Sequence, residues 1–304
     1  MKLAPIVLFA YNRPDHLLST LNALKENDLA DQSTLYIFCD GPKSNATKEQ
    51  LVSIEQVRIA AKSNQWCKEV NIIERIENLG LAQSIITGVT EIVNKYGRVV
   101  VLEDDLVTSK GFLRYMNQAL NMYQDESQVM HISGYMFPIN TKNIRDTTTF
   151  YNSASCWGWG TWANKWCNFN SDAQYIYDHV VESGRSRDFN IGGFGNFLRQ
   201  LRKNINGTMD TWAIKWYGSI FIRNGHCLHP TTSLVRNIGN DDSGTNSKKS
   251  QYYDSTLIEY INIKKIPLKE NTIIRKKMIT YYFNQKRIKH TLLYPLIKLF
   301  PSKF

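Results

Sequence analysis

The chain has 304 residues, 42% hydrophobic and 21% charged, so it can bury a core and is not a disordered polymer. Its formal net charge of +10 favours an anionic partner, such as nucleic acid, an anionic membrane surface or a phosphorylated substrate. The five cysteines contain no CxxC pair, which argues against a zinc site and favours free thiols in a reducing compartment.

The N-terminal apolar run is too short for a signal peptide and no cleavage site follows it, so we expect it to form the first core strand. No stretch approaches the roughly 20 apolar residues that a membrane-spanning helix needs. We therefore expect a cytoplasmic protein.

Strand-like and helix-like segments alternate through the first half of the chain. Apolar runs predict strands at 5–11, 34–40, 70–76, 98–105 and 129–137. Helical spacing of apolar residues predicts helices near 17–24, 54–60, 81–96 and 111–123. This alternation indicates parallel βαβ units with strands buried on both faces.

In such a sheet, ligands bind beyond the carboxyl ends of the strands. Three polar groups directly follow predicted strands, and we expect them on one rim: Asn12-Arg13, Asp40 and Glu103-Asp104-Asp105.

The composition changes near residue 147. A tryptophan-rich segment follows, then helical and polar material to about Asn206, and then a polar run ending in NDDSGTN that we expect to be a mobile loop. We expect residues 1–146 and 147–262 to form two halves of one compact body. Residues 263–304 would form a basic amphipathic extension.

The acidic triplet Glu103-Asp104-Asp105 is the strongest local signal. Adjacent carboxylates after a buried strand repel one another unless they share a cation, and hard oxygen ligands suit Mg²⁺ or Mn²⁺. Continued as an extended strand, the triplet would point Glu103 and Asp105 to one face and Asp104 to the other. A solvated turn before the next helix is the alternative.

The other candidates are less specific. Asp40 could accept hydrogen bonds from a nucleoside, although an Asp-Gly pair is also a common turn. Arg13 could bind phosphate or stack on a base, or lie in a surface turn before Pro14. Asp210 could be a general base or a helix N-cap.

Aromatic and basic residues suggest two further surfaces. Trp157 and Trp159, in WGWG, could form a platform for a sugar or acceptor, although core packing is the common role of such rings. The basic C-terminal segment carries interleaved aromatic and aliphatic residues, which suits contact with anionic lipid or packing on the domain. We interpret His226 and His229 as structural residues.

The motifs YNRP, CDGP, ENLGLAQSI and VVVLEDDLVTSKGF, in this order over about residues 4–246, resemble those of GT-A glycosyltransferases. The resemblance is to the N-acetylglucosaminyltransferase I type and its bacterial sugar-transferase relatives. It implies a GT-A fold, which is a Rossmann-like α/β fold with a mixed, mainly parallel sheet flanked by helices. Residues 1–146 would be the half that binds the nucleotide-sugar donor, and residues 147–262 would be the acceptor-binding and catalytic half. A helical, basic C-terminal extension would follow.

The resemblance also implies a metal-dependent, inverting transfer of a hexosyl or N-acetylhexosaminyl group. Asp105 would bind Mn²⁺ or Mg²⁺ directly, Asp210 would be the general base, and Ser243 would reach the diphosphate. The remaining donor-binding positions would be Asn12, Arg13, Asp40, Asn78, Gly80, Leu81, Glu103 and Asp104.

The expected partners are a nucleotide-diphosphate sugar, a UDP-sugar in the first place, and a saccharide or lipid-linked saccharide acceptor. Surface polysaccharide biosynthesis, with the basic tail touching the inner face of the membrane, would fit. The alternatives are a nucleotidyltransferase, which usually has a Gly-rich loop after its first strand, and a non-catalytic carbohydrate- or membrane-binding module. No nucleic-acid-binding motif is present.

Overall fold

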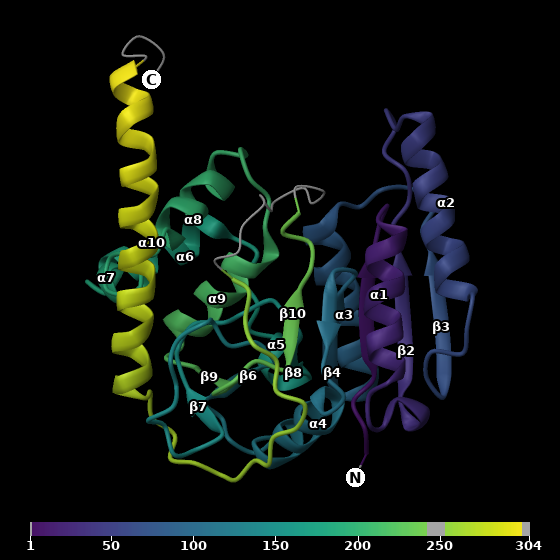
Figure 1. The fold of residues 1–304 in the computed structure, drawn as a ribbon, viewed down its shortest axis with the longest axis horizontal. Helices are drawn as coiled ribbons and strands as arrows, with labels where there is room; N and C mark the ends of the chain where they lie inside the picture. The colour runs from purple at the N-terminus through teal and green to yellow at the C-terminus, as the bar shows by residue number, and fades with distance from the viewer. Residues whose placement is uncertain (1, 242–252, 300–304) are drawn as a thin grey trace.

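The computed structural model describes residues 2–241 and 253–299, and side chains as far as residue 287. These residues form an eight-stranded sheet flanked by helices (Figure 1). In spatial order the strands are β3 (Glu69–Glu74), β2 (Thr34–Cys39), β1 (Ile6–Ala10), β4 (Arg98–Glu103), β8 (Trp159–Trp162), β6 (Val129–Ser133), β9 (His226–Pro230) and β7 (Thr148–Phe150).

The first four strands in this order are parallel to one another. Strand β8 runs antiparallel to both of its neighbours, β4 and β6, and β9 is parallel to β6. The edge strand β7 is antiparallel to β9. The predicted α/β fold, with a mixed and mainly parallel sheet of the GT-A kind, is confirmed.

Helices cover both faces of this sheet. One face packs against α1 (Pro14–Lys25), α2 (Lys48–Lys62) and α4 (Phe112–Met122). The other packs against α3 (Leu81–Tyr96), α5 (Ala163–Trp166) and α9 (Trp212–Ile222). Strand β1 shows why both faces are apolar. Ile6 and Leu8 enter the first core and Val7 and Phe9 the second, as alternation along a strand requires.

The second half of the chain contributes elements that periodicity did not predict. The tryptophan-rich segment contains β8, which is inserted between β4 and β6 and is buried throughout. A separate two-stranded sheet joins β5 (Leu106–Thr108) to β10 (Val235–Asn237). The main sheet therefore contains strands from both sides of residue 146.

Three further helices pack on the outside of α9. They are α6 (Ala173–Glu182), α7 (Ser186–Phe189) and α8 (Phe197–Ile205), and they share a small apolar core with that helix. A short 3₁₀ turn, η1 (Ala30–Gln32), precedes β2.

The C-terminal helix α10 (Thr272–Leu299) stands along one side of the molecule (Figure 1). Its first turns are docked on the body. Ile274 and Met278 are fully buried, and the rings of Tyr281 and Tyr282 lie 5.5 and 5.9 Å from that of Phe137. This part of the extension is helical, as expected, but its apolar residues pack on the protein.

Candidate active site

The three predicted polar groups do lie on one rim. Strands β1, β2 and β4 are adjacent and parallel, so the residues that follow them emerge at the same edge of the sheet. Arg13 follows β1, Asp40 follows β2, and Asp104 and Asp105 follow β4. This edge holds most of the positions that the sequence singled out.

Arg13 bridges the two aspartates. Its Nη2 atom donates to Asp105 Oδ2 at 2.9 Å and also to Asp104 Oδ1. The expectation that Asp104 and Asp105 point to opposite faces is therefore wrong. Strand β4 ends at Glu103 and the chain turns there, so strand alternation does not extend through the triplet.

The triplet still carries more negative charge than Arg13 neutralises. Burial, and then the charges of Asp105 and Asp104, raise the pKa of Glu103 to about 8. Burial raises the pKa of Asp104 to about 6, although the charge of Arg13 opposes this. Burial alone would lower the pKa of Arg13, but the two aspartates outweigh it and raise the pKa. The acidic triplet therefore has negative charge that Arg13 leaves uncompensated.

The end of β10 and the residues that follow it lie against Asp105. Asn237 Nδ2 donates to Asp105 Oδ1 at 3.1 Å, and the Ile238 N–H donates to the Asp105 carbonyl oxygen at 2.9 Å. A Cβ atom added to Gly239 would lie only 2.1 Å from Asp105 Oδ2 and 2.7 Å from Arg13 Nη1. A larger residue here would require the end of the Asp105 or Arg13 side chain to move. Strand β10 and the residues that follow it are therefore part of the site, and most of the polar run that we expected to be a mobile loop lies outside the described residues.

The carboxylates at this rim suit a divalent cation of the Mg²⁺ or Mn²⁺ kind, because their oxygens are hard ligands and their negative charge is in excess. Within residues 2–241 and 253–299, no group of three His, Cys, Asp or Glu side chains could hold a metal ion alone. Such an ion would need further oxygens from water or a diphosphate, as is usual for Mg²⁺.

Asp40 organises the neighbouring loop. Its two oxygens accept hydrogen bonds from the backbone N–H groups of Leu79 at 3.0 Å and Gly80 at 3.1 Å. Asn78 Nδ2 donates to the Gly41 carbonyl oxygen at 2.9 Å. A Cβ at Gly41 would lie 2.5 Å from the backbone of Glu77, so the two loops touch directly. Asp40 thereby positions Asn78, Gly80 and the exposed side chain of Leu81, which begins α3.

Two residues near Asp40 were missed by the sequence analysis. The Tyr11 hydroxyl is buried and has no hydrogen-bond partner among the described residues. Arg75, which follows β3, places Nη1 3.8 Å from Asp40 Oδ1 and lies over the Phe38 ring. Both lie in loops directly after a strand, and that position was the only signal in the sequence. Asn12, between Tyr11 and Arg13, is half-buried.

The predicted general base is exposed. The Asp210 side chain is 73% accessible and its Oδ1 pairs with Lys215 Nζ at 3.0 Å. Thr211, not Asp210, is the N-cap of α9. Asp210 therefore lies in the loop before α9, without a buried environment of its own. Ser243 falls outside the described residues.

Trp159 cannot be a sugar platform. Its side chain is fully buried in β8 and packs against Trp212 and His131 at ring distances of 5.0 and 5.4 Å. That expectation was wrong because Trp159 is the first residue of the core strand β8. Trp157 is only half-buried, and its ring lies 5.5 Å from that of Tyr253.

The two histidines of the second half have structural contacts. His226 Nδ1 lies 3.0 Å from Asn152 Oδ1. His229 is fully buried, and its Nε2 lies 2.9 Å from the Ser153 carbonyl oxygen. The interpretation of both as structural residues is consistent with these positions.

The close approach of Gly239 yields a prediction. In Gly239→Ala the added methyl group must displace Asp105 or Arg13, and overpacking of this kind costs about 1–3 kcal/mol. We expect the affinity for Mn²⁺ with a nucleoside diphosphate, measured by calorimetry, to fall about tenfold.

Gly97→Ala is the control. It strains a backbone with φ of +82° before β4, at the opposite edge of the sheet. It should lower the melting temperature and leave binding intact. Equal binding losses in the two variants would show that Gly239 acts only through stability.

The sequence and the structure can be compared with those of known proteins. Residues 6–185, more than half of the chain, match the family model for glycosyl transferase family 2. No curated protein sequence gives a significant match.

Solved structures with partial similarity include mouse xyloside xylosyltransferase 1 in its apo form. It is 7% identical with a TM-score of 0.39, over 72% of this chain and 81% of that one. An active-site mutant of LgtC is 8% identical with a TM-score of 0.38, over 71% and 70%. S. aureus TarS is 14% identical with a TM-score of 0.32, over 58% and 27%. On the family match, the chain belongs to glycosyl transferase family 2.

Proposed function

We propose that this glycosyltransferase is metal-dependent and inverting, and that it moves a hexosyl or N-acetylhexosaminyl group from a nucleotide-diphosphate sugar to an acceptor hydroxyl. The supporting observation is the acidic end of β4. Glu103, Asp104 and Asp105 lie beside Arg13 at the carboxyl edge of the sheet, with negative charge left over. A subtype like N-acetylglucosaminyltransferase I remains part of the proposal.

The donor would lie along this rim. Asp105 would hold Mn²⁺ or Mg²⁺, and a bound divalent ion would offset the charge that grows on the leaving diphosphate. Arg13 would hold Asp104 and Asp105 in place, and its charge would add to the positive field at the phosphates. Asn12 and Glu103 would complete the contacts with the ribose and donor sugar.

The nucleoside would bind at the loop that Asp40 organises. The carboxylate of Asp40 already accepts backbone N–H groups of this loop, so its main task would be to hold Asn78, Gly80 and Leu81 in position. The unpaired Tyr11 hydroxyl offers a further hydrogen bond to a base or ribose. We propose a UDP-sugar as the donor.

The acceptor would attack from the opposite side of the anomeric carbon. Asp210 would accept the proton of the acceptor hydroxyl, and its ion pair with Lys215 would hold the carboxylate in position. Attack in line with the departing diphosphate inverts the anomeric centre, and no covalent enzyme intermediate is needed. Ser243 would approach the diphosphate.

The proposed biological setting is surface polysaccharide biosynthesis on a saccharide or lipid-linked saccharide acceptor. Among the described residues, no helix is long and apolar enough to cross a membrane. The basic and apolar residues at the C-terminal end of α10 and beyond motivate a peripheral location at the inner face of the membrane.

The decisive test is calorimetric titration of nucleoside diphosphates with and without Mn²⁺. We expect one of them, UDP in the first place, to bind only when metal is present. Asp105→Ala should abolish this binding, because it removes the metal ligand. Asp125→Asn, an exposed aspartate before β6 at the opposite edge of the sheet, is the matched control and should bind like wild type.

Metal-independent binding, or no binding of any nucleotide, would contradict the donor site and favour a non-catalytic carbohydrate- or membrane-binding module. Release of pyrophosphate from a nucleoside triphosphate and a sugar phosphate would instead identify a nucleotidyltransferase.

A second prediction concerns the general base. Asp210→Asn should lower kcat by about 10²-fold or more, because proton removal of this kind contributes 10²–10⁴-fold. Donor binding should be unchanged. Asp178→Asn, a half-buried aspartate on α6, should retain activity. A wild-type kcat in Asp210→Asn would assign the base to another residue.

A third prediction concerns the tail. Deletion of residues 288–304 leaves the docked turns of α10 with Ile274 and Met278 in place, so the fold should survive. Wild-type protein should sediment with phosphatidylglycerol vesicles and not with phosphatidylcholine vesicles, and the deletion should remove this binding. Equal sedimentation of the two proteins with anionic vesicles would refute membrane contact by the tail.

A further inference from the structure

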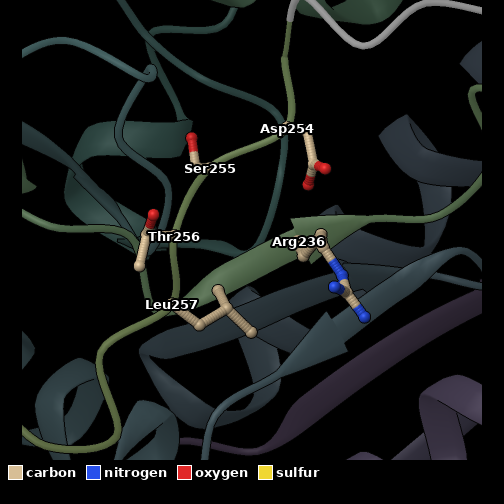
Figure 2. A pocket seen from close by; sticks show the side chains of 5 residues that line it. All are labelled: Arg236, Asp254, Ser255, Thr256 and Leu257. Carbon is tan, nitrogen blue, oxygen red and sulfur yellow. The ribbon is translucent and has the colours of Figure 1, made fainter.

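A cleft of about 340 Å³ lies beside β10. This volume is in the range of roughly 300–1,000 Å³ that is usual for small-molecule sites. Figure 2 shows that its side chains come from two segments, namely Arg236 from β10 and Asp254, Ser255, Thr256 and Leu257 from the stretch next to it. The donor and metal positions described above include none of these residues.

The wall formed by 254–257 is fixed to the body by hydrogen bonds. The Ile258 N–H donates to the Ser233 carbonyl oxygen at 2.9 Å, and Leu257 forms a parallel bridge with Ser233. Ser255 Oγ donates to the Met136 carbonyl oxygen at 2.7 Å and is buried. Because both walls are held by main-chain contacts, the cleft exists before any ligand binds.

The charged groups of the cleft are exposed. Arg236 and Asp254 are both exposed, and Figure 2 shows the Arg236 side chain running away from the carboxylate of Asp254. Among the described residues, neither the guanidinium nor the carboxylate has an ion-pair or hydrogen-bond partner. A guanidinium offers only donors and a carboxylate only acceptors, so together they match the hydroxyl groups of a ligand.

The two opposite charges also indicate which ligand fits. A phosphate or carboxylate would be attracted by Arg236 and repelled by Asp254, whereas an uncharged polyol can use both. Thr256 adds an exposed hydroxyl. Tyr253, next to Asp254, contacts the half-buried ring of Trp157, so aromatic side chains lie beside this wall.

The cleft is next to the donor rim but separate from it. Asn237 contacts Asp105, and successive side chains of a strand point to opposite faces, so Arg236 points away from the metal position. Because Arg236 and Asn237 are consecutive, their Cα atoms are only about 3.8 Å apart. A saccharide in the cleft would therefore lie near the reaction without touching the donor.

We infer that this cleft is a distal acceptor subsite, which binds a neutral sugar unit next to the one that reacts. The inference rests on the proposed transferase function for its place in the reaction. Arg236 and Asp254 form the hydrogen bonds, and they act on acceptor affinity without altering the donor site.

The test is saturation-transfer NMR of full-length protein with neutral disaccharides built from glucose, galactose and N-acetylglucosamine. We expect at least one of them to bind, and Arg236→Met and Asp254→Asn each to raise its Kd by about tenfold, because each loses charge-assisted hydrogen bonds. Arg114→Met, an exposed arginine on α4, is the matched control. Titration of the same variants with Mn²⁺ and UDP should give wild-type values.

The outcomes separate the two proposals. Failure of wild-type protein to bind any nucleotide would contradict the proposed function, while disaccharide binding could still be measured. The subsite is overturned if no disaccharide binds, or if the variants bind it as well as wild type does. It is also overturned if the variants lose nucleotide binding, or if inorganic phosphate binds through Arg236 more tightly than the disaccharides.

Discussion

The contact of Arg13 with Asp104 and Asp105 is the interaction on which the site depends. Three consecutive acids at the end of a buried strand repel one another, and burial makes the repulsion stronger. A single guanidinium from the neighbouring strand holds two of them. The parallel pairing of β1 with β4 brings these groups together, because it ends both strands at the same edge.

The same contact ties the second half of the chain to the first. The residues that lie against Asp105 are Asn237, Ile238 and Gly239. They are brought there because β10 pairs with β5, and β5 begins directly after the acidic triplet. The acidic triplet and the segment that contacts it are therefore parts of one small structure. A change in β10 should therefore alter the position of Asp105, although the two are far apart in sequence.

The donor rim divides into two regions with different physical character. Around Asp40 the polar groups are largely satisfied by the backbone of the 78–80 loop, so this region is rigid and shaped in advance. Around Glu103 the charges are left incompletely compensated. The first arrangement suits recognition of an uncharged nucleoside. The second suits the binding of a cation by carboxylate oxygens.

The sequence by itself determined the first half of the fold and the rim. Residues such as Val99–Val101 and Leu35–Ile37 form continuous apolar runs between amphipathic helices, and such runs define strands that are buried on both faces. Once those strands were assigned, the rule that parallel strands end at one edge placed Arg13, Asp40 and Asp105 together.

Only the tertiary structure decided what the second half contributes. Local pattern could not show that Trp159 lies in a core strand, because a tryptophan between glycines has the same sequence whether its ring is buried or exposed. It could not show that Asn237 and Gly239 contact Asp105, because antiparallel pairing of β10 with β5 joins residues more than a hundred positions apart. The cleft of Arg236 and Asp254 arises in the same way, from two segments that meet only in the folded chain.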